Sequence, residues 1–234
     1  MGNFDFGSFA KETSVSSNNY LRPYSVYENV KFAGIEGPTS GTSANGNDWT
    51  RYDFIFSCPD GTYKESIFAP NNPEKDTQRS KVTNANGHET ELPSNFERTM
   101  EFLKYVGKTF NPAGLEKLQK ISGKISSFAE FIEAFKKCIG TPDTTTTMKL
   151  GGRVNQGSVY AALPNYLAIN NKTGEVFIRD HVFGDKVALS AWELSKKKEY
   201  ESAKPTDMSK KENNINKESN SDDNQSVDSL LDEL

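Results

Sequence analysis

Apolar and polar positions alternate with a period of two along much of residues 24–69, and this period is typical of half-buried β-strands. We expect three strands in this segment. In the second, residues 49–58, Tyr52, Phe54 and Phe56 share one face. The turn sequence Pro59-Asp60-Gly61 predicts a hairpin between the second strand and a third one at residues 62–68. This part of the chain is therefore expected to form antiparallel β-structure.

Polar segments interrupt this pattern, and a different period follows them. Residues 37–47 and 70–93 are rich in polar side chains, Gly and Pro, and are expected to be loops. Apolar side chains then recur at helical spacing, and Ser94 with Glu97 predicts a capping box at the start of the first helix. We expect three helices, at residues 94–107, 112–121 and 127–138.

The period of two returns after the helices, at residues 147–154, 158–163 and 175–179. The expected order is therefore three strands, a helical insertion over about residues 94–140, and two or three more strands. A five-stranded antiparallel Greek-key barrel of the OB type has its helix between strands 3 and 4. We expect a mainly β, OB-like barrel with helices at that place. The alternative is another α+β domain in which helices cover one face of an antiparallel sheet.

Composition divides the chain into three parts. Residues 1–19 form an expected flexible arm with three phenylalanines, Phe4, Phe6 and Phe9. These dock either on the domain or on a neighbouring copy, and the second alternative would be self-association through the arm. Residues 20–195 form the expected OB-like domain. Residues 196–234 are dominated by Lys, Glu, Ser, Asn and Asp, and such a segment buries too little apolar surface to offset the entropy of ordering. We expect a disordered linker and tail there.

Charge is distributed unevenly along the chain. The formal net charge is -4, but the segment from Glu218 onwards contains six acidic residues and neither Lys nor Arg, which leaves about +2 on residues 1–217. A mildly basic domain with an acidic terminus allows the tail to compete with an anionic ligand. Cys58 and Cys138 form no CxxC pair, so we expect reduced thiols and a cytoplasmic location. No stretch of 18 apolar residues predicts a membrane span.

Single-stranded nucleic acid requires aromatic side chains that stack on bases, at about 1–3 kcal/mol each, and cations that contact phosphates. Trp49 is in phase with Arg51 along its strand and out of phase with the buried aromatics of the same strand. The alternative is that cations on strands form only a solvated face. The predicted interface consists of Tyr27, Lys31, Trp49, Arg51, Tyr63, Lys64, Lys149, Arg153 and Tyr160.

The C-terminal residues interleave acids with aliphatic side chains: Asp222, Asp223, Asp228, Leu230, Leu231, Asp232, Glu233 and Leu234. With a β-rich domain before it, this tail resembles the single-stranded DNA-binding proteins of bacteria and tailed phages. The resemblance implies an OB fold, a role in DNA replication, recombination and repair, and a tail that binds partner proteins of those processes and occupies the DNA groove in the absence of DNA. It also implies the host cytoplasm if a phage encodes the chain. The tails of that family commonly end in an aromatic residue, whereas this one ends in Leu234.

The sequence contains no pattern that predicts catalysis. It lacks a Gly-rich phosphate loop ending in GKS or GKT, and His88 and His181, its two histidines, lie in separate regions. We therefore expect a protein without enzymatic activity, cofactor or metal, whose partners are single-stranded DNA and replication or recombination proteins. A structural or scaffold protein, such as a virion component that makes protein contacts only, is the alternative. RNA in place of DNA is a further one.

Overall fold

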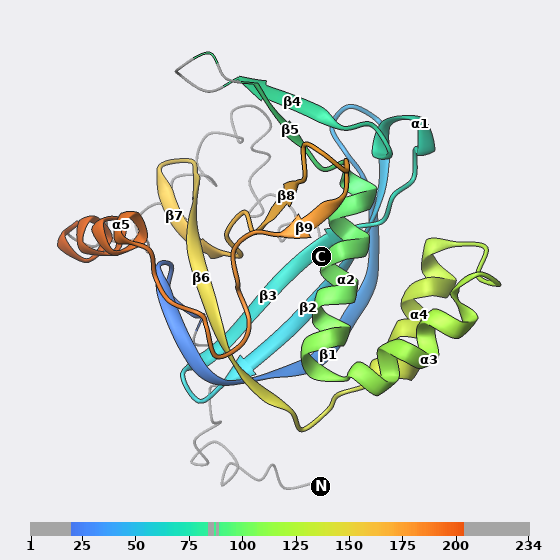
Figure 1. Cartoon of the computed structure of the whole chain (residues 1–234), viewed down its shortest axis with the longest axis horizontal. Coiled ribbons are helices and arrows are strands. Elements are labelled where there is room, and N and C mark those ends of the chain that lie inside the picture. Colours follow the sequence, from blue (N-terminus) through green and yellow to red (C-terminus); the bar gives the residue numbers. More distant parts are fainter. Residues whose placement is uncertain (1–19, 84–86, 88, 204–234) are drawn as a thin grey trace, which may run out of the picture. The chain divides into compact units, whose positions relative to one another are not determined.

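The computed structural model describes residues 20–83, 87 and 89–203. Contacts divide the chain at Lys197. Except for the last helix, which crosses this boundary, the sheets and helices described below belong to the first unit. Five antiparallel strands form its main sheet in the order β3-β2-β1-β6-β7 (Figure 1). The strands are β1 (Ser25–Thr42), β2 (Asp48–Cys58), β3 (Gly61–Phe68), β6 (Thr145–Asn155) and β7 (Ser158–Ala162). The prediction of a mainly β fold with a helical insertion is confirmed.

The central strand β1 is long because it pairs with two neighbouring strands over different parts of its length. Residues 25–31 pair with β6 and residues 31–42 pair with β2. Register shifts between Tyr27 and Val30 and between Phe32 and Gly34 interrupt these ladders, and such bulges bend a strand. The predicted loop at residues 37–47 is wrong over most of its length, since β1 continues to Thr42.

The main sheet is open, with β3 and β7 as its two edges. A side chain spans the gap near these edges: the hydroxyl of Tyr63 on β3 accepts a hydrogen bond from the backbone N–H of Leu163, just after β7, at 3.0 Å. The same hydroxyl donates to the carboxylate of Glu65. The structure therefore confirms a sheet of five antiparallel strands. Within the described residues, β3 and β7 form no ladder with each other, so the sheet is open where the sequence predicted a barrel.

Three helices lie between β3 and β6, as predicted: α2 (Asn95–Phe110), α3 (Pro112–Ser122) and α4 (Phe128–Ile139). The capping box of Ser94 and Glu97 is present at the start of α2. Helix α2 packs on the inner face of the sheet, where the rings of Phe102 and Phe54 lie 5.1 Å apart in an edge-to-face contact. The aromatic side chains that alternation assigned to the buried face of β2 are thus in the core.

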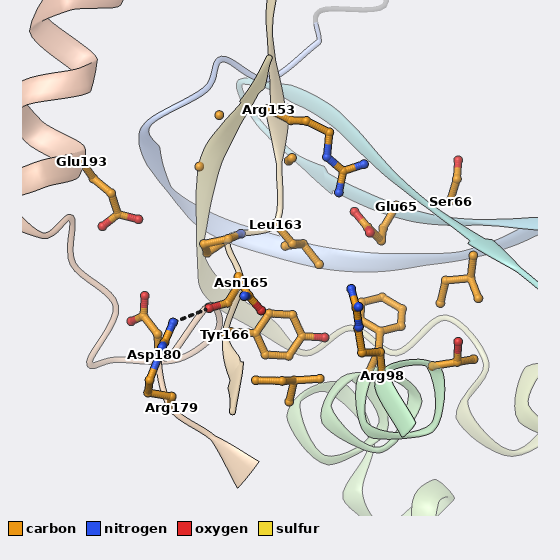
Figure 2. Close-up of a pocket in the computed structure, with 18 of the residues that line it drawn as sticks. Glu65, Ser66, Arg98, Arg153, Leu163, Asn165, Tyr166, Arg179, Asp180 and Glu193 are labelled. Atoms are coloured by element: carbon orange, nitrogen blue, oxygen red, sulfur yellow. Dashed lines mark hydrogen bonds between the residues drawn. The ribbon is translucent and has the colours of Figure 1, made fainter. Parts of the chain in front are cut away.

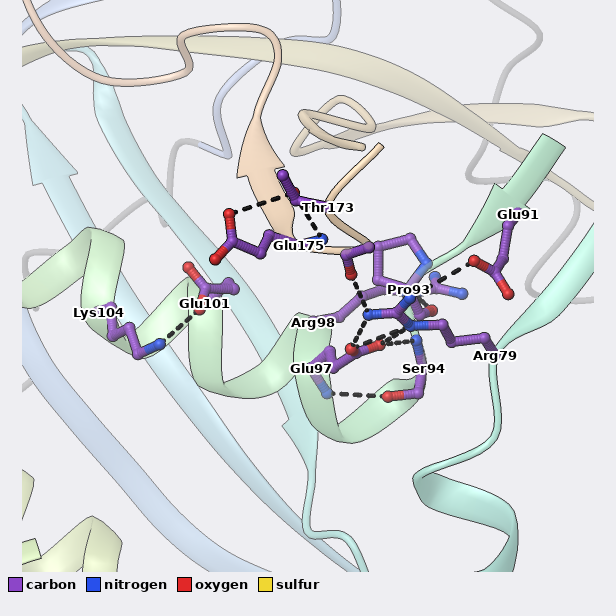
Figure 3. A network of polar contacts seen from close by, with 11 residues as sticks. Arg79, Glu91, Pro93, Ser94, Glu97, Arg98, Glu101, Lys104, Thr173 and Glu175 are labelled. Atoms are coloured by element: carbon purple, nitrogen blue, oxygen red, sulfur yellow. Dashed lines mark hydrogen bonds and ion pairs between the residues drawn. The ribbon is translucent and has the colours of Figure 1, made fainter. Parts of the chain in front are cut away.

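Residues 70–83 and 89–93 contain more regular structure than the predicted loop. They contain α1 (Pro73–Asp76) and a hairpin of β4 (Ser80–Thr83) and β5 (Glu89–Leu92). Figure 3 shows the polar network that anchors this hairpin. Arg79 donates to the carboxylate of Glu97 on α2, with Nε 3.0 Å from Oε1, and to the carbonyl of Gly174 at 2.7 Å. Gly174 lies between β8 (Leu167–Ile169) and β9 (Val176–Ile178), so Arg79 links three segments that are distant in sequence.

The last described element is α5 (Ala191–Ser202). It begins after a reciprocal cap, because Ser190 Oγ accepts from the N–H of Glu193 and the Ser190 N–H donates to the Glu193 carboxylate. The predicted disorder is therefore wrong for residues 196–202, which lie in this helix. The arm at residues 1–19 and the tail at residues 204–234 fall outside the described residues. None of the helices that the structure describes is long and apolar enough to cross a bilayer.

Candidate nucleic-acid interface

The outer face of β2 and β3 carries a pair of aromatic rings. Trp49 and Phe68 meet edge to face, with their centroids 5.8 Å apart, and Phe68 is 50% exposed. The indole also lies close to β1 at Gly41, where an added Cβ would be 2.7 Å from the ring. The absence of a side chain at Gly41 therefore lets the indole lie against the backbone. Trp49 points to the side of the sheet that the alternation predicted.

Cations on the outer surface of the sheet have carboxylate partners. Arg51 Nε lies 3.1 Å from Asp53, and Lys64 Nζ lies 2.6 Å from Glu36. Lys31 is also at the surface, 3.5 Å from Asp143. Exposed ion pairs such as those of Lys31 and Lys64 contribute only about 0–1 kcal/mol. A phosphate can therefore replace the carboxylate at Lys31 and Lys64 at little cost. The Arg51–Asp53 pair is more covered, with side chains that are 36% and 15% exposed.

Three predicted interface residues are buried, which removes them from this surface. The Tyr27 hydroxyl donates to the Arg22 carbonyl, and Tyr63 bridges β3 to the chain after β7. Lys149 is 1% exposed, with Nζ 2.7 Å from Asp180 and 3.3 Å from Glu193.

Later segments of the chain explain the burial of Lys149. The backbone N–H of Lys149 donates to the carbonyl of Val182 at 2.9 Å, so the chain after β9 runs beside β6. The first turn of α5 then contributes Glu193 to the same place. Strand alternation predicted an exposed lysine because it depends on the residues of the strand itself and contains no information on the later segments that cover it. For Tyr27, the register shift that follows it in β1 accompanies the inward orientation of the ring.

The hairpin of β6 and β7 presents the remaining two predicted residues. Arg153 and Tyr160 are directly opposite each other in the ladder. Arg153 is exposed, and Tyr160 is 50% exposed. Opposed residues in an antiparallel ladder lie within contact range. The structure therefore brings a predicted cation and a predicted aromatic side chain together.

A pocket of about 840 Å³ lies at the open edge of the sheet. Its walls come from β3, from α2, from β6, and from the chain after β7. Figure 2 shows Arg98 of α2 and Arg153 of β6 pointing into a common space, with Glu65 and Tyr166 beside it. The pocket thus occupies the region where β3 and β7 do not pair.

The acidic side chains that line the pocket have hydrogen-bond or ion-pair partners, whereas its arginines form no ion pairs within the described residues. The three acids are engaged: Glu65 accepts from Tyr63, while Asp180 and Glu193 both bind Lys149. Burial also raises the pKa of the Glu65 carboxyl, which favours its neutral form.

The three arginines of the pocket have no such partners. Within the part of the chain that the structure describes, none of Arg98, Arg153 and Arg179 forms an ion pair. Arg98 Nε donates to the carbonyl of Pro93, and Arg179 donates to the carbonyl of Asn165, both at 3.1 Å. Each guanidinium group has five N–H donors, so most of these donors stay available to an anion.

Arg98 and Arg179 were absent from the predicted interface. The sequence did contain a signal for Arg98, because it lies four residues before Phe102 and seven before Tyr105, and both of these are buried. That spacing places the arginine on the inward side of α2. Arg179 follows the short strand β9, and no local pattern of the sequence relates it to β3.

No protein-family model, curated protein or solved structure matches this chain. The resemblance to single-stranded DNA-binding proteins therefore rests on the organisation of the sequence. The tail residues on which it partly depends lie outside the described residues: Asp222, Asp223, Asp228, Leu230, Leu231, Asp232, Glu233 and Leu234.

Proposed function

We propose that this protein binds single-stranded DNA on the outer face of β2 and β3 and has no enzymatic activity. The strand order β3-β2-β1-β6-β7, with the helical segment between β3 and β6, supports an OB-type connectivity. In this proposal the domain is an OB barrel whose seam between β3 and β7 is left open. OB folds bind single strands on the face that strands 2 and 3 form.

The observation that carries the proposal is that the outer-face rings of Trp49 and Phe68 adjoin arginines that form no ion pair within the described residues. Phe68 contacts Trp49 on the outer face and also lines the pocket that Arg98 and Arg153 enter. A strand whose bases stack on the two rings thus has guanidinium groups next to it for its phosphates. Stacking and phosphate contacts together are what binding of a single strand requires. Tyr160, opposite Arg153, extends the same surface.

The acidic tail has a second role in this proposal. Its carboxylates resemble a phosphate backbone in charge, so the tail competes with DNA for the arginines when no DNA is bound. When a strand displaces it, the aliphatic side chains of Leu230, Leu231 and Leu234 are available to replication and recombination proteins. The arm at residues 1–19 is proposed to support self-association.

Fluorescence anisotropy of a labelled oligo(dT) tests the binding and the role of the tail in one experiment. The full chain is compared with a version that ends at Lys217 and therefore lacks the six acids. We expect both proteins to bind, and the shorter one to bind more tightly at low salt. If neither protein binds at low salt, the DNA proposal fails and the scaffold alternative takes its place. Oligo(rU) in the same assay shows whether RNA is preferred.

A further inference from the structure

The pocket at the open edge contains a tyrosine whose ring is largely buried and whose hydroxyl has no protein partner among the described residues. Tyr166 is 8% exposed, and its hydroxyl has no hydrogen bond to any other residue that the structure describes. Figure 2 shows this hydroxyl directed toward the space beside Arg98. The hydroxyl is therefore available to donate a hydrogen bond to a ligand in the pocket.

The shape and lining of the pocket restrict the class of that ligand. A volume of about 840 Å³ lies within the range of small-molecule sites. Phe102, Leu167 and Ala162 supply apolar wall, while Arg98 and Arg153 supply donors without ion-pair partners. A flat, largely apolar body that carries an anionic group fits these walls. A cation does not fit them, because the acids of the pocket are already engaged by Tyr63 and Lys149.

We propose that this pocket receives one nucleotide extruded from the bound single strand, with its phosphate on Arg98 and Arg153 and its base against Phe102 and Tyr166. The Tyr166 hydroxyl then donates to a carbonyl oxygen of the base. This inference rests on the proposed function. The route is short, because Phe68, which lines the pocket, also belongs to the stacking face.

Photocrosslinking of the full chain tests this placement directly. A dT oligonucleotide containing one 5-iodo-2′-deoxyuridine is irradiated in the complex, and the crosslinked peptides are identified by mass spectrometry. We expect crosslinks at Tyr166 or Phe102 as well as at Trp49 or Phe68. Because Tyr166 and Phe102 are 8% and 4% exposed, only a base inside the pocket reaches them. Crosslinks confined to Trp49 and Phe68 would overturn the pocket while leaving DNA binding intact. If the oligonucleotide does not bind at all, the proposed function fails first.

Two substitutions measure the contribution of the pocket. Tyr166→Phe removes only the hydroxyl that has no partner, so the melting temperature is expected to stay unchanged while oligo(dT) affinity falls about five- to tenfold. Arg98→Gln is expected to lower the affinity by a similar factor. Tyr200→Phe and Lys117→Gln, which remove a hydroxyl and a charge elsewhere, serve as controls. Affinities of the pocket variants equal to those of the controls would contradict the proposal.

A free nucleotide carries the same base and phosphate groups and is therefore the alternative ligand of the pocket. 5-Iodo-2′-deoxyuridine monophosphate is irradiated with the full chain, with and without an excess of oligo(dT). If the monophosphate labels Tyr166 or Phe102 and the oligonucleotide does not displace it, the site belongs to free nucleotides and the proposal fails. Displacement by the oligonucleotide supports a site for a nucleotide of the strand.

Discussion

Replacing Lys149 by methionine is expected to lower the free energy of unfolding by about 3 kcal/mol without changing the affinity for DNA. The Lys149 side chain is 2% exposed and binds Asp180 and Glu193, whose side chains are 45% and 7% exposed. Breaking a buried ion pair by removing one partner costs about 3–5 kcal/mol, because a charge is left uncompensated. Asp180 regains water at its half-exposed position, whereas Glu193 does not, and the cost is therefore placed at the low end of that range.

Urea unfolding of the full chain measures this loss as a lower midpoint at unchanged slope. Adding Glu193→Gln to Lys149→Met is expected to restore part of the stability, because the uncompensated charge is removed. Lys64→Met is the matched control. Its partner Glu36 is 61% exposed, so the loss stays below about 1 kcal/mol, while oligo(dT) affinity falls. If Lys149→Met left stability unchanged and weakened DNA binding, the lysine would be at the interface, as strand alternation predicted.

Three further predictions concern the stacking face and the hairpin anchor. Trp49→Ala is expected to weaken oligo(dT) binding by about tenfold or more in anisotropy, since one stacking ring contributes about 1–3 kcal/mol. Gly41→Ala is expected to weaken binding in the same direction, because its Cβ would lie 2.7 Å from the indole and displace it; unchanged affinity would show that the indole position is unimportant. Hydrogen bonds from Arg79 hold the pKa of Glu97 at about 2. Stability from this pair is therefore present above the ordinary glutamate pKa near 4.5 and is lost as the pH falls toward 2. In thermal melts between pH 2 and 7, the melting temperature of Glu97→Gln is expected to fall less steeply toward low pH than that of the unsubstituted protein. Identical pH profiles of the two proteins would contradict this.

Local patterns predicted the elements whose stability is local. The alternation in β2, the turn at Pro59-Asp60-Gly61 and the capping box at Ser94 each depend on residues that are neighbours in sequence, and all three are present in the structure. The C-terminal part of β1 was missed because Gly, Ser and Thr at residues 37–42 indicate a loop by composition. Hydrogen bonding to β2 holds this segment in an extended conformation, although its own side chains do not favour a strand.

The candidate site was harder to predict because distant segments build it. Lys149 is buried by residues more than thirty positions later in the chain, at Asp180 and Glu193. The pocket brings Glu65, Arg98 and Arg153 together from three elements, and no spacing within the sequence relates them. Trp49, by contrast, was placed correctly on the outer face, because its position depends on the phase of a single strand.

The most direct test of the central claim is the salt dependence of oligo(dT) binding. Single-stranded binding loses about 0.7 in the slope of log K against log salt for each phosphate contact. Contacts from Arg51, Lys64, Arg98 and Arg153 therefore predict a slope of about -3, which falls to about -2 for Arg98→Gln. A salt-independent affinity, or no binding at low salt, would contradict the account.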